Sequence, residues 1–328
     1  MSSLPNLMNT ISQRTRSTSE NCDARRKLWR EALGAPLEDF LSRQGKRIRA
    51  DLIGIAFRIA GGKGEAPSEI VEFVELLHAG SLIIDDIQDN SRNRRRQETM
   101  HLKYGVPLAI NTGNWLYFAA LERLAEVDLP PAKAMAIMNK SLRVIKHCHA
   151  GQALDLTATF NELPPHAIPQ TVEQISQLKT GALTALAAWL GGMLGGGSDE
   201  VCENLSNFGL QLGIGLQMQN DFVELQKAAF SRCNSDDFRN RRITWPWAWL
   251  ANTANATEVQ RLARLACEQI PEVQDCAQQI LERIEIVAVN EINSKLEGSI
   301  SELNTIDLDP RIRKQLDQIV ATLELRYV

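Results

Sequence analysis

Apolar residues recur every three or four positions along almost the whole chain, a spacing that places them on one face of a helix. No segment of the sequence shows the sustained alternation of apolar and polar residues that indicates a half-buried strand. The pattern therefore predicts an all-α protein. The expected helices cover residues 24–42, 45–60, 67–89, 106–126, 131–157, 171–194, 200–229, 244–253, 257–269, 273–297 and 310–326.

Clusters of glycine and proline interrupt this helical pattern, as at 61–64 and 163–169, but none has the length of a linker between domains. No internal repeat of fixed period is present. We therefore expect residues 23–328 to form one all-α domain, a helical bundle around a central apolar cavity. The first residues are rich in Ser, Thr and Asn and lack the apolar core of a signal peptide, so 1–22 is expected to be a flexible lead.

One predicted helix ends in a cluster of carboxylates. Residues 70–84 are apolar on nearly every face, which indicates a buried helix, and Asp85, Asp86 and Asp89 follow directly. In a helix Asp85 and Asp89 share one face and Asp86 is rotated to the side, at the end where the macrodipole is negative. Buried, crowded carboxylates persist only when cations neutralise them. The sequence therefore predicts a site for positive charge here.

Two positive partners are available for these carboxylates. One is the basic run that follows at once, Arg92, Arg94, Arg95 and Arg96. The other is a divalent metal, and a set of oxygen ligands suits magnesium, which usually shares its shell with water and substrate phosphates. Both can act together if the acids hold magnesium, magnesium holds a diphosphate and the arginines take the remaining phosphate charge. A solvated acidic helix end paired with a basic loop is the simpler alternative.

Charge and composition narrow the classes of function. The chain has 328 residues, a net charge of −4 and a pI near 5.8, which argues against nucleic-acid binding. The arginine run is therefore a local feature and is expected to bind a small anion. The six cysteines are scattered without a CxxC pair and are expected to be reduced thiols of a cytoplasmic protein. The apolar stretch 181–197 is shorter than the ~20 residues of a membrane-spanning helix, so no stable membrane insertion is expected.

Further polar residues interrupt the predicted helices, and each alone is a weak signal. Lys46 and Arg49 share one face near a helix start, where backbone amides add affinity for anions. His78 lies two turns before the carboxylates, where a lone histidine is usually a satisfied core residue. The others are Lys179 and Thr180 at the head of an apolar helix, a polar stripe of Gln217, Asn220, Asp221 and Glu224, and Arg242 before a proline-started helix.

Taken in chain order, these segments resemble the trans-isoprenyl diphosphate synthases, or polyprenyl synthetases, from Gly45 to about Leu250. Residues 45–49 (GKRIR) are similar to the GKR-L-R segment of that family, and His78 with 85–91 (DDIQDNS) is similar to its first aspartate-rich motif. The remaining matches follow in family order: Arg94, Arg95, Thr99 and His101 in the arginine loop, 151–156 (GQALDL), 179–181 (KTG), Gln217 before a second acidic cluster, and Thr244 with Pro246.

The resemblance implies an isoprenoid-synthase-type fold and a prenyltransferase that condenses an allylic prenyl diphosphate with isopentenyl diphosphate. In such enzymes metals and cations pull on the allylic diphosphate until it leaves, and the isopentenyl double bond attacks the resulting carbocation. The family is generally homodimeric. By this resemblance isopentenyl diphosphate is bound by Lys46, Arg49, His78 and Arg95, and the allylic diphosphate is bound by magnesium, Arg94, Lys179 and Arg242.

The same resemblance implies two magnesium sites and a set of catalytic residues. The first metal site matches Asp85, Asp86 and Asp89, and the second matches Asn220, Asp221 and Glu224. In the family scheme the expected catalytic residues are the three aspartates of the first site together with Lys179, Thr180 and Gln217, which border the cation.

Departures from the family pattern leave alternatives open. Asn220 stands where the family places a metal-binding aspartate, so that metal is expected to be held more weakly; Arg242 replaces a lysine and Arg96 a glycine. An Asn-Asp start is similar to related terpene cyclases, which need no isopentenyl diphosphate, and a weakly active partner subunit is a third alternative. Retention of the whole isopentenyl set favours elongation. Gly80 provides no aromatic floor below the first aspartate, which hints at a geranylgeranyl or longer product.

Overall fold

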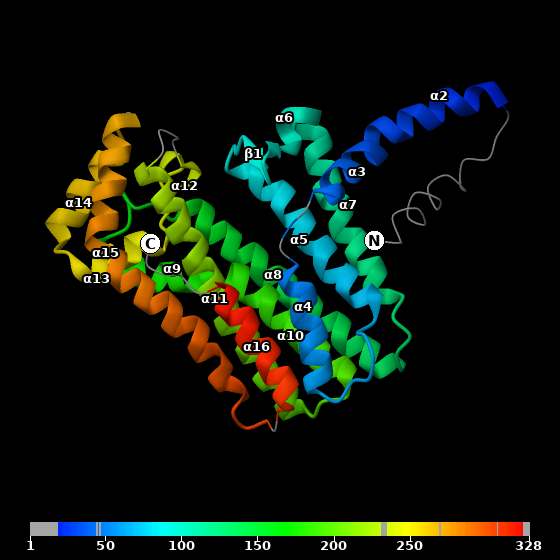
Figure 1. Cartoon of the computed structure of the whole chain (residues 1–328). Coiled ribbons are helices and arrows are strands. Elements are labelled where there is room, and N and C mark those ends of the chain that lie inside the picture. The colour runs from blue at the N-terminus through cyan, green and yellow to red at the C-terminus, as the bar shows by residue number, and fades with distance from the viewer. Residues whose placement is uncertain are drawn as a thin grey trace. The chain divides into compact units, whose positions relative to one another are not determined.

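The computed structural model describes residues 19–43, 45, 47–230, 235–268, 270–306 and 308–323. These residues are almost wholly helical, as the apolar periodicity predicts (Figure 1). None of the described helices is both long and apolar enough to cross a lipid bilayer. The described residues group into two compact units. The first unit combines the described residues of Met1–Arg47 and Glu72–Glu126, and the second combines those of Ile48–Val71 and Val127–Val328.

The first unit is built from helices that share an apolar core. Residues 19–42 follow one helical path, close to the predicted helix 24–42, with a π-helical turn in its middle; residues 1–18 of the expected lead lie outside the described residues. Phe40, Ile83 and Leu116 are buried together in the core. The elements are α2 (Ser19–Trp29), η1 (Arg30–Gly34), α3 (Ala35–Ser42), α5 (Ser68–Gln88, from Glu72 on), β1 (Asn93–Arg94), β2 (Gln97–Glu98), α6 (Met100–Tyr104) and α7 (Val106–Ala125).

The second unit contains the longest helices of the described chain. Helix α10 packs against both α4 and α11, and α11 packs along α15. The prediction of a single domain over 23–328 stays a prediction. The elements are α4 (Ile48–Ile59), α8 (Pro131–Thr157), η2 (Pro165–Ala167), α9 (Ile168–Ser176), the π-turn η3 (Gln177–Gly181), α10 (Ala182–Gly195), α11 (Asp199–Phe230), α12 (Asp236–Arg239), α13 (Trp245–Thr253), α14 (Ala256–Leu265), α15 (Ile270–Ser299), η4 (Ile300–Leu303) and α16 (Pro310–Leu323).

A small hairpin follows α5, and the sequence pattern does not predict it (Figure 1). Its two strands have two residues each and pair antiparallel, with Asn93 opposite Glu98. Arg95 and Arg96 form the turn, with φ of +54° and +64°. Two left-handed residues are typical of a type I′ turn, whose twist suits a hairpin but which usually contains Asn and Gly. Strands this short carry no alternation that a sequence could reveal.

Candidate active site

The acidic end of α5 in the first unit is neutralised by an arginine from the hairpin. Asp86 is fully buried, and Arg94 contacts its Oδ1 with Nη2 at 2.6 Å and with Nε at 2.7 Å. The same guanidinium lies 3.6 Å from Oδ2 of Asp85. Burial raises the pKa of Asp86 to about 6, although the charge and hydrogen bond of Arg94 oppose that shift. The arginine run therefore supplies one of the positive partners that buried carboxylates require.

Asp85 and Asp89 differ from Asp86 because both remain partly exposed. The Asp89 N–H donates to the Asp85 carbonyl at 2.9 Å, so helical spacing places the two side chains on one face. A cation of the magnesium type usually takes one or two protein carboxylates and completes its shell with water and substrate phosphates. Among the described residues, no three His, Cys, Asp or Glu side chains gather into a full set of metal ligands. The donors at this helix end fit a divalent cation that is shared with a phosphate ligand.

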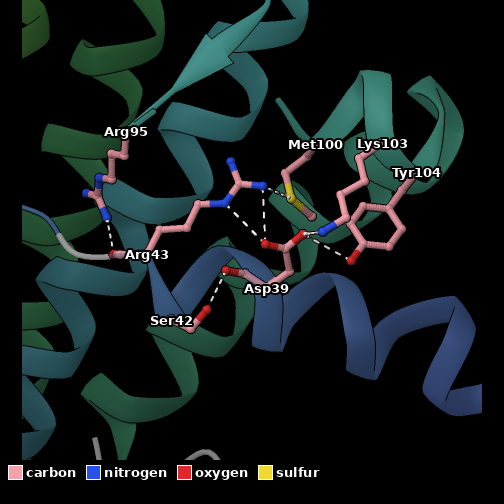
Figure 2. A network of polar contacts seen from close by, with 7 residues as sticks. All are labelled: Asp39, Ser42, Arg43, Arg95, Met100, Lys103 and Tyr104. Carbon is pink, nitrogen blue, oxygen red and sulfur yellow. Dashed lines mark hydrogen bonds and ion pairs between the residues drawn. The ribbon is translucent and has the colours of Figure 1, made fainter. Parts of the chain in front are cut away.

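Arg95, in the turn of the hairpin, extends the positive charge of this region. Its Nη1 donates a hydrogen bond of 2.8 Å to the main-chain carbonyl of Arg43 (Figure 2). Gly45 leaves room for this contact, because a side chain at that position would overlap the Arg95 guanidinium. Burial and the neighbouring charges of Arg94 and Arg43 lower the pKa of Arg95. Cations crowded in this way are stabilised by an anion, and a diphosphate suits the fork geometry of arginine.

In the second unit, the π-turn η3 presents Lys179 and Thr180. Single π-helical turns within helices are frequent at functional sites. Lys179 Nζ donates to Oδ2 of Asp155 on α8 at 2.8 Å. Helix α8 comes this close because residue 151 is glycine: a Cβ there would lie 2.7 Å from the Cβ of Leu178 and 2.9 Å from the main-chain nitrogen of Lys179. The motif match contains Asp155, but sequence reasoning does not assign it to the site.

Gln217 on α11 connects Thr180 to the second acidic motif. Its Oε1 accepts a hydrogen bond of 2.6 Å from the Thr180 hydroxyl, and its Nε2 donates to Oδ1 of Asp221 at 2.7 Å. The other carboxylate oxygen of Asp221 accepts from the main-chain N–H of Trp245 at 3.1 Å. Burial raises the pKa of Asp221 to about 7 even though both hydrogen bonds favour its charged form. Both oxygens of Asp221 are therefore engaged in holding neighbouring groups.

The other two residues of the second motif are more accessible. Asn220 is exposed on α11. Glu224, one turn later, pairs through Oε1 with Nζ of Lys227 at 2.6 Å, and its side chain is 45% exposed. An amide and a single, partly exposed carboxylate carry less negative charge than the two partly exposed aspartates at the end of α5. The expectation of weaker metal binding at this motif stays a prediction.

Main-chain hydrogen bonds fix the buried Arg242 in the second unit. Its Nη1 donates to the carbonyl of Asp155 at 2.8 Å, and its N–H donates to the carbonyl of Asp237 at 2.8 Å. It also pairs with Thr159 in an isolated β-bridge. Lys179 and Arg242 thus contact the same residue, Asp155, one at its side chain and the other at its main chain.

The tryptophans that follow Arg242 belong to the core of this unit. Trp245, Trp247 and Trp249 are all buried. Phe160 stacks on Trp247 with ring centroids 4.3 Å apart, which ties the segment after α8 to α13. Rings this well covered serve packing, and the stack lies close in sequence to both partners of the Thr159–Arg242 bridge.

The remaining predicted residues fall in both units. His78 is half-buried on α5, and Arg49 is half-buried on α4. Lys46 lies outside the described residues. The first unit carries His78, Asp85, Asp86, Asp89, Arg94 and Arg95, and the second carries Arg49, Lys179, Thr180, Gln217, Asn220, Asp221, Glu224 and Arg242.

A family model described as polyprenyl synthetase matches residues 30–284, most of the chain. The chain belongs to the polyprenyl synthetase family. Polyprenyl synthetases use a divalent metal, in line with the oxygen donors at the end of α5.

Curated relatives include a geranylgeranyl diphosphate synthase of Methanosarcina mazei, 34% identical over 181 residues (55% of this chain and 55% of the relative). The geranylgeranyl pyrophosphate synthase penG of Penicillium ochrochloron is 35% identical over 221 residues (66% and 58%). The chain therefore spans little more than half the length of these polyprenyl synthetase relatives.

Solved structures share the fold of this chain. The geranylgeranyl pyrophosphate synthetase from Pyrococcus horikoshii has a TM-score of 0.76 at 25% identity, over 93% of this chain and 91% of that one. A decaprenyl diphosphate synthase from Rhodobacter capsulatus has a TM-score of 0.76 at 22% identity, over 98% and 95%. The predicted isoprenoid-synthase-type helical fold is confirmed.

Proposed function

We propose that this protein is a trans-prenyltransferase that condenses an allylic prenyl diphosphate with isopentenyl diphosphate. The observation that carries the proposal is the end of α5, where two partly exposed carboxylates lie beside an arginine hairpin. Acidic oxygens next to arginines suit a ligand that brings both a divalent cation and phosphate charge. The names of the relatives, geranylgeranyl and longer prenyl diphosphate synthases, support this chemistry and a product of geranylgeranyl length or longer.

The first step of this reaction is departure of the allylic diphosphate. Magnesium bound by the two partly exposed aspartates of α5 would neutralise the leaving group. Arg94 would add fixed positive charge for the same phosphates, and the resemblance to the family gives Lys179 and Arg242 this role as well. Asp155 holds both Lys179 and Arg242, so their charges are oriented before the substrate binds. Preorganised charge of this kind lowers the barrier to ionisation because no side chain has to rearrange as the negative charge develops.

The second step joins isopentenyl diphosphate to the allylic cation. The isopentenyl double bond attacks the cationic carbon, and the departed diphosphate takes the proton that is then lost. The crowded cations around Arg95 support a diphosphate-binding role for that residue. The proposed ligands of the isopentenyl diphosphate are Lys46, Arg49, His78 and Arg95.

Around the allylic cation, polar side chains held in a fixed orientation would take the place of water. Thr180 and Gln217, hydrogen-bonded to each other at 2.6 Å, are proposed to border the cation, with Asp221 holding Gln217 in place. A second magnesium would be reached first by Asn220 and Glu224, because Asp221 is buried and each of its oxygens already accepts one hydrogen bond. Asn220 is also the observation that favours the alternative function, a terpene cyclase that ionises a prenyl diphosphate without isopentenyl diphosphate.

Product analysis distinguishes these functions. The purified protein with magnesium receives geranyl, farnesyl or geranylgeranyl diphosphate, each with and without isopentenyl diphosphate, and mass spectrometry identifies the products. A longer prenyl diphosphate that forms only with isopentenyl diphosphate supports the transferase. A hydrocarbon or alcohol formed without it would establish the cyclase instead. No product in any reaction would point to a partner subunit. The double variant Asp85→Asn, Asp89→Asn is the inactive control.

We also propose that the protein is a cytoplasmic homodimer. Val106, Ile110 and Phe118 lie on one face of α7 and are exposed, Phe118 with 71% of its surface. Exposed apolar side chains grouped on one helix face are typical of a protein–protein interface. The described cysteines include four free thiols, which is typical of a reducing compartment. Light scattering after gel filtration tests the dimer: Phe118→Glu should yield monomers, and a wild-type monomer would contradict the proposal.

A further inference from the structure

The carboxylate of Asp39, in the last turn of α3, accepts hydrogen bonds from a residue just after α3 and from residues of α6 (Figure 2). Its Oδ1 accepts from Nε and Nη2 of Arg43, both at 3.3 Å. Its Oδ2 accepts from Nζ of Lys103 at 2.7 Å and from the hydroxyl of Tyr104 at 3.0 Å. Burial would raise the pKa of Asp39, but the hydrogen bonds from Lys103 and Tyr104 and the charge of Arg43 outweigh it and lower the pKa. The carboxylate is therefore charged and ties α3 to α6.

The side chain of Arg43 depends on this carboxylate. It is 1% exposed, and Asp39 is its ion-pair partner. Its other neighbours are weak ones: the Sδ of Met100 lies 3.6 Å from Nη2, and the ring of Phe40 lies 5.6 Å from the guanidinium carbon. A buried guanidinium whose carboxylate is removed becomes an uncompensated charge and moves toward water. The conformation of Arg43 therefore follows the presence of Asp39.

Arg43 also presents its main-chain carbonyl to Arg95. The Arg95 Nη1 donates to this oxygen at 2.8 Å, 52 residues away in sequence (Figure 2). Gly45, two residues after Arg43, lies against the same guanidinium. Any movement of the chain at Arg43 would therefore shift both the acceptor and the surface on which the Arg95 side chain rests. In Figure 2 no dashed line joins Asp39 to Arg95, whereas Arg43 is joined to both, so the influence of Asp39 on Arg95 passes through Arg43.

We propose that Asp39 is a positioning residue for diphosphate binding: it fixes Arg43, and Arg43 sets the place of the Arg95 guanidinium. This inference rests on the proposed function, in which Arg95 binds the diphosphate of isopentenyl diphosphate. It assigns a selective effect, because Asp39 acts on the isopentenyl substrate through Arg95 and leaves the charges that hold the allylic diphosphate untouched.

The test compares the KM values of the two substrates in Asp39→Asn. A displaced Arg95 should raise the KM for isopentenyl diphosphate about tenfold, because small errors in the position of a binding group cost large factors. The KM for the allylic diphosphate should change less than about twofold. Lys103→Ala is the matched control: it removes a partner of the same carboxylate but leaves the Asp39–Arg43 pair, so both KM values should stay at the wild-type level. Equal effects on both substrates, or none, would overturn the proposal.

A double-mutant cycle tests the route through Arg95. In an Arg95→Ala background, Asp39→Asn should no longer lower kcat/KM for isopentenyl diphosphate, whereas an undiminished loss there would contradict the proposal. If Asp39→Asn does not fold, Arg43→Lys keeps a cation for Asp39 but loses the fork and should raise the same KM to a smaller extent. Failure of the proposed function is a separate result, because it is seen in the wild-type protein as no elongation and no calorimetric binding of isopentenyl diphosphate.

Discussion

The carbonyl oxygen of Gly113 lies 2.8 Å from the point where a Cβ on Gly80 would stand. The main chains of α5 and α7 therefore approach each other at these two glycines. The contact is reciprocal, because a Cβ on Gly113 would lie 3.3 Å from the carbonyl oxygen of Gly80. Close helix packing accounts for the glycine at position 80, so the lack of an aromatic side chain there is not by itself evidence for a longer product. The expectation of a geranylgeranyl or longer product now depends on the relatives.

Replacing Gly80 by alanine should therefore destabilise the protein. A methyl group facing a backbone carbonyl must push the helices apart, and overpacking of this kind costs about 1–3 kcal/mol in the free energy of unfolding. Gly54→Ala on α4 is the matched control, since a Cβ there meets only Nη1 of Arg58 at 3.5 Å. Urea denaturation measures both. Wild-type stability in Gly80→Ala would show that the helices can separate without cost.

Replacing Arg96 by glycine should have the opposite effect. Arg96 has φ of +64°, and an L-residue in this region costs about 1–2 kcal/mol relative to glycine. Arg96→Gly is expected to raise the free energy of unfolding by about 1 kcal/mol. Arg92→Gly controls for the loss of an exposed arginine, because Arg92 is not among the residues with positive φ. No gain in Arg96→Gly over this control would mean that the side chain makes compensating contacts.

Asp221 should make stability fall as pH rises toward neutrality. Its pKa is raised from 3.8 to about 7, so between these values the native protein binds more protons than the unfolded chain. The stability from this group is full below the lower value and declines, by at most about 1.4 kcal/mol per pH unit, up to the higher one. Asp221→Asn cannot titrate, and its unfolding free energy should decline less between about pH 5 and pH 7 than that of the wild type.

The decline that remains in Asp221→Asn has an identified source. The pKa of Asp86 is also raised, to about 6, so that carboxyl should contribute over the lower part of the same range. Parallel curves for the wild type and Asp221→Asn would mean that Asp221 does not titrate in this range.

Gly151 allows α8 to support the turn that carries Lys179. In Gly151→Ala the new methyl group would collide with Leu178 and the main chain of Lys179, so the turn must shift. We expect a loss of about 1–3 kcal/mol in stability and a lower kcat at saturating substrates. Gly298→Ala is the control, because nothing lies within 4 Å of a Cβ at that position. A stable Gly151→Ala protein with wild-type kcat would contradict this role.

The sequence predicts the helices well because each buries an apolar face, and it predicts the acidic end of α5 because buried carboxylates are rare. It cannot predict the π-turns, since apolar spacing continues through 177–181 without a break. The contacts of Asp39 are also invisible, because Lys103 is 64 residues away and a lone aspartate carries no pattern. The sequence also does not reveal that Gly80 faces the main chain of α7 at Gly113. Contacts between distant segments are the information that periodicity lacks.

The pairing of Arg94 with Asp86 means that the fold at the end of α5 does not depend on a bound metal ion, even if activity does. Because this buried carboxylate already has its cation, the end of α5 needs no metal ion to hold its shape, unlike small proteins that unfold without zinc. A chelator should therefore abolish activity while the melting temperature changes by less than about 2 °C, and added magnesium should restore full activity without a refolding step. Under the proposed function, the rate of prenyl elongation would then depend on the concentration of free divalent metal, while the folded structure stays the same.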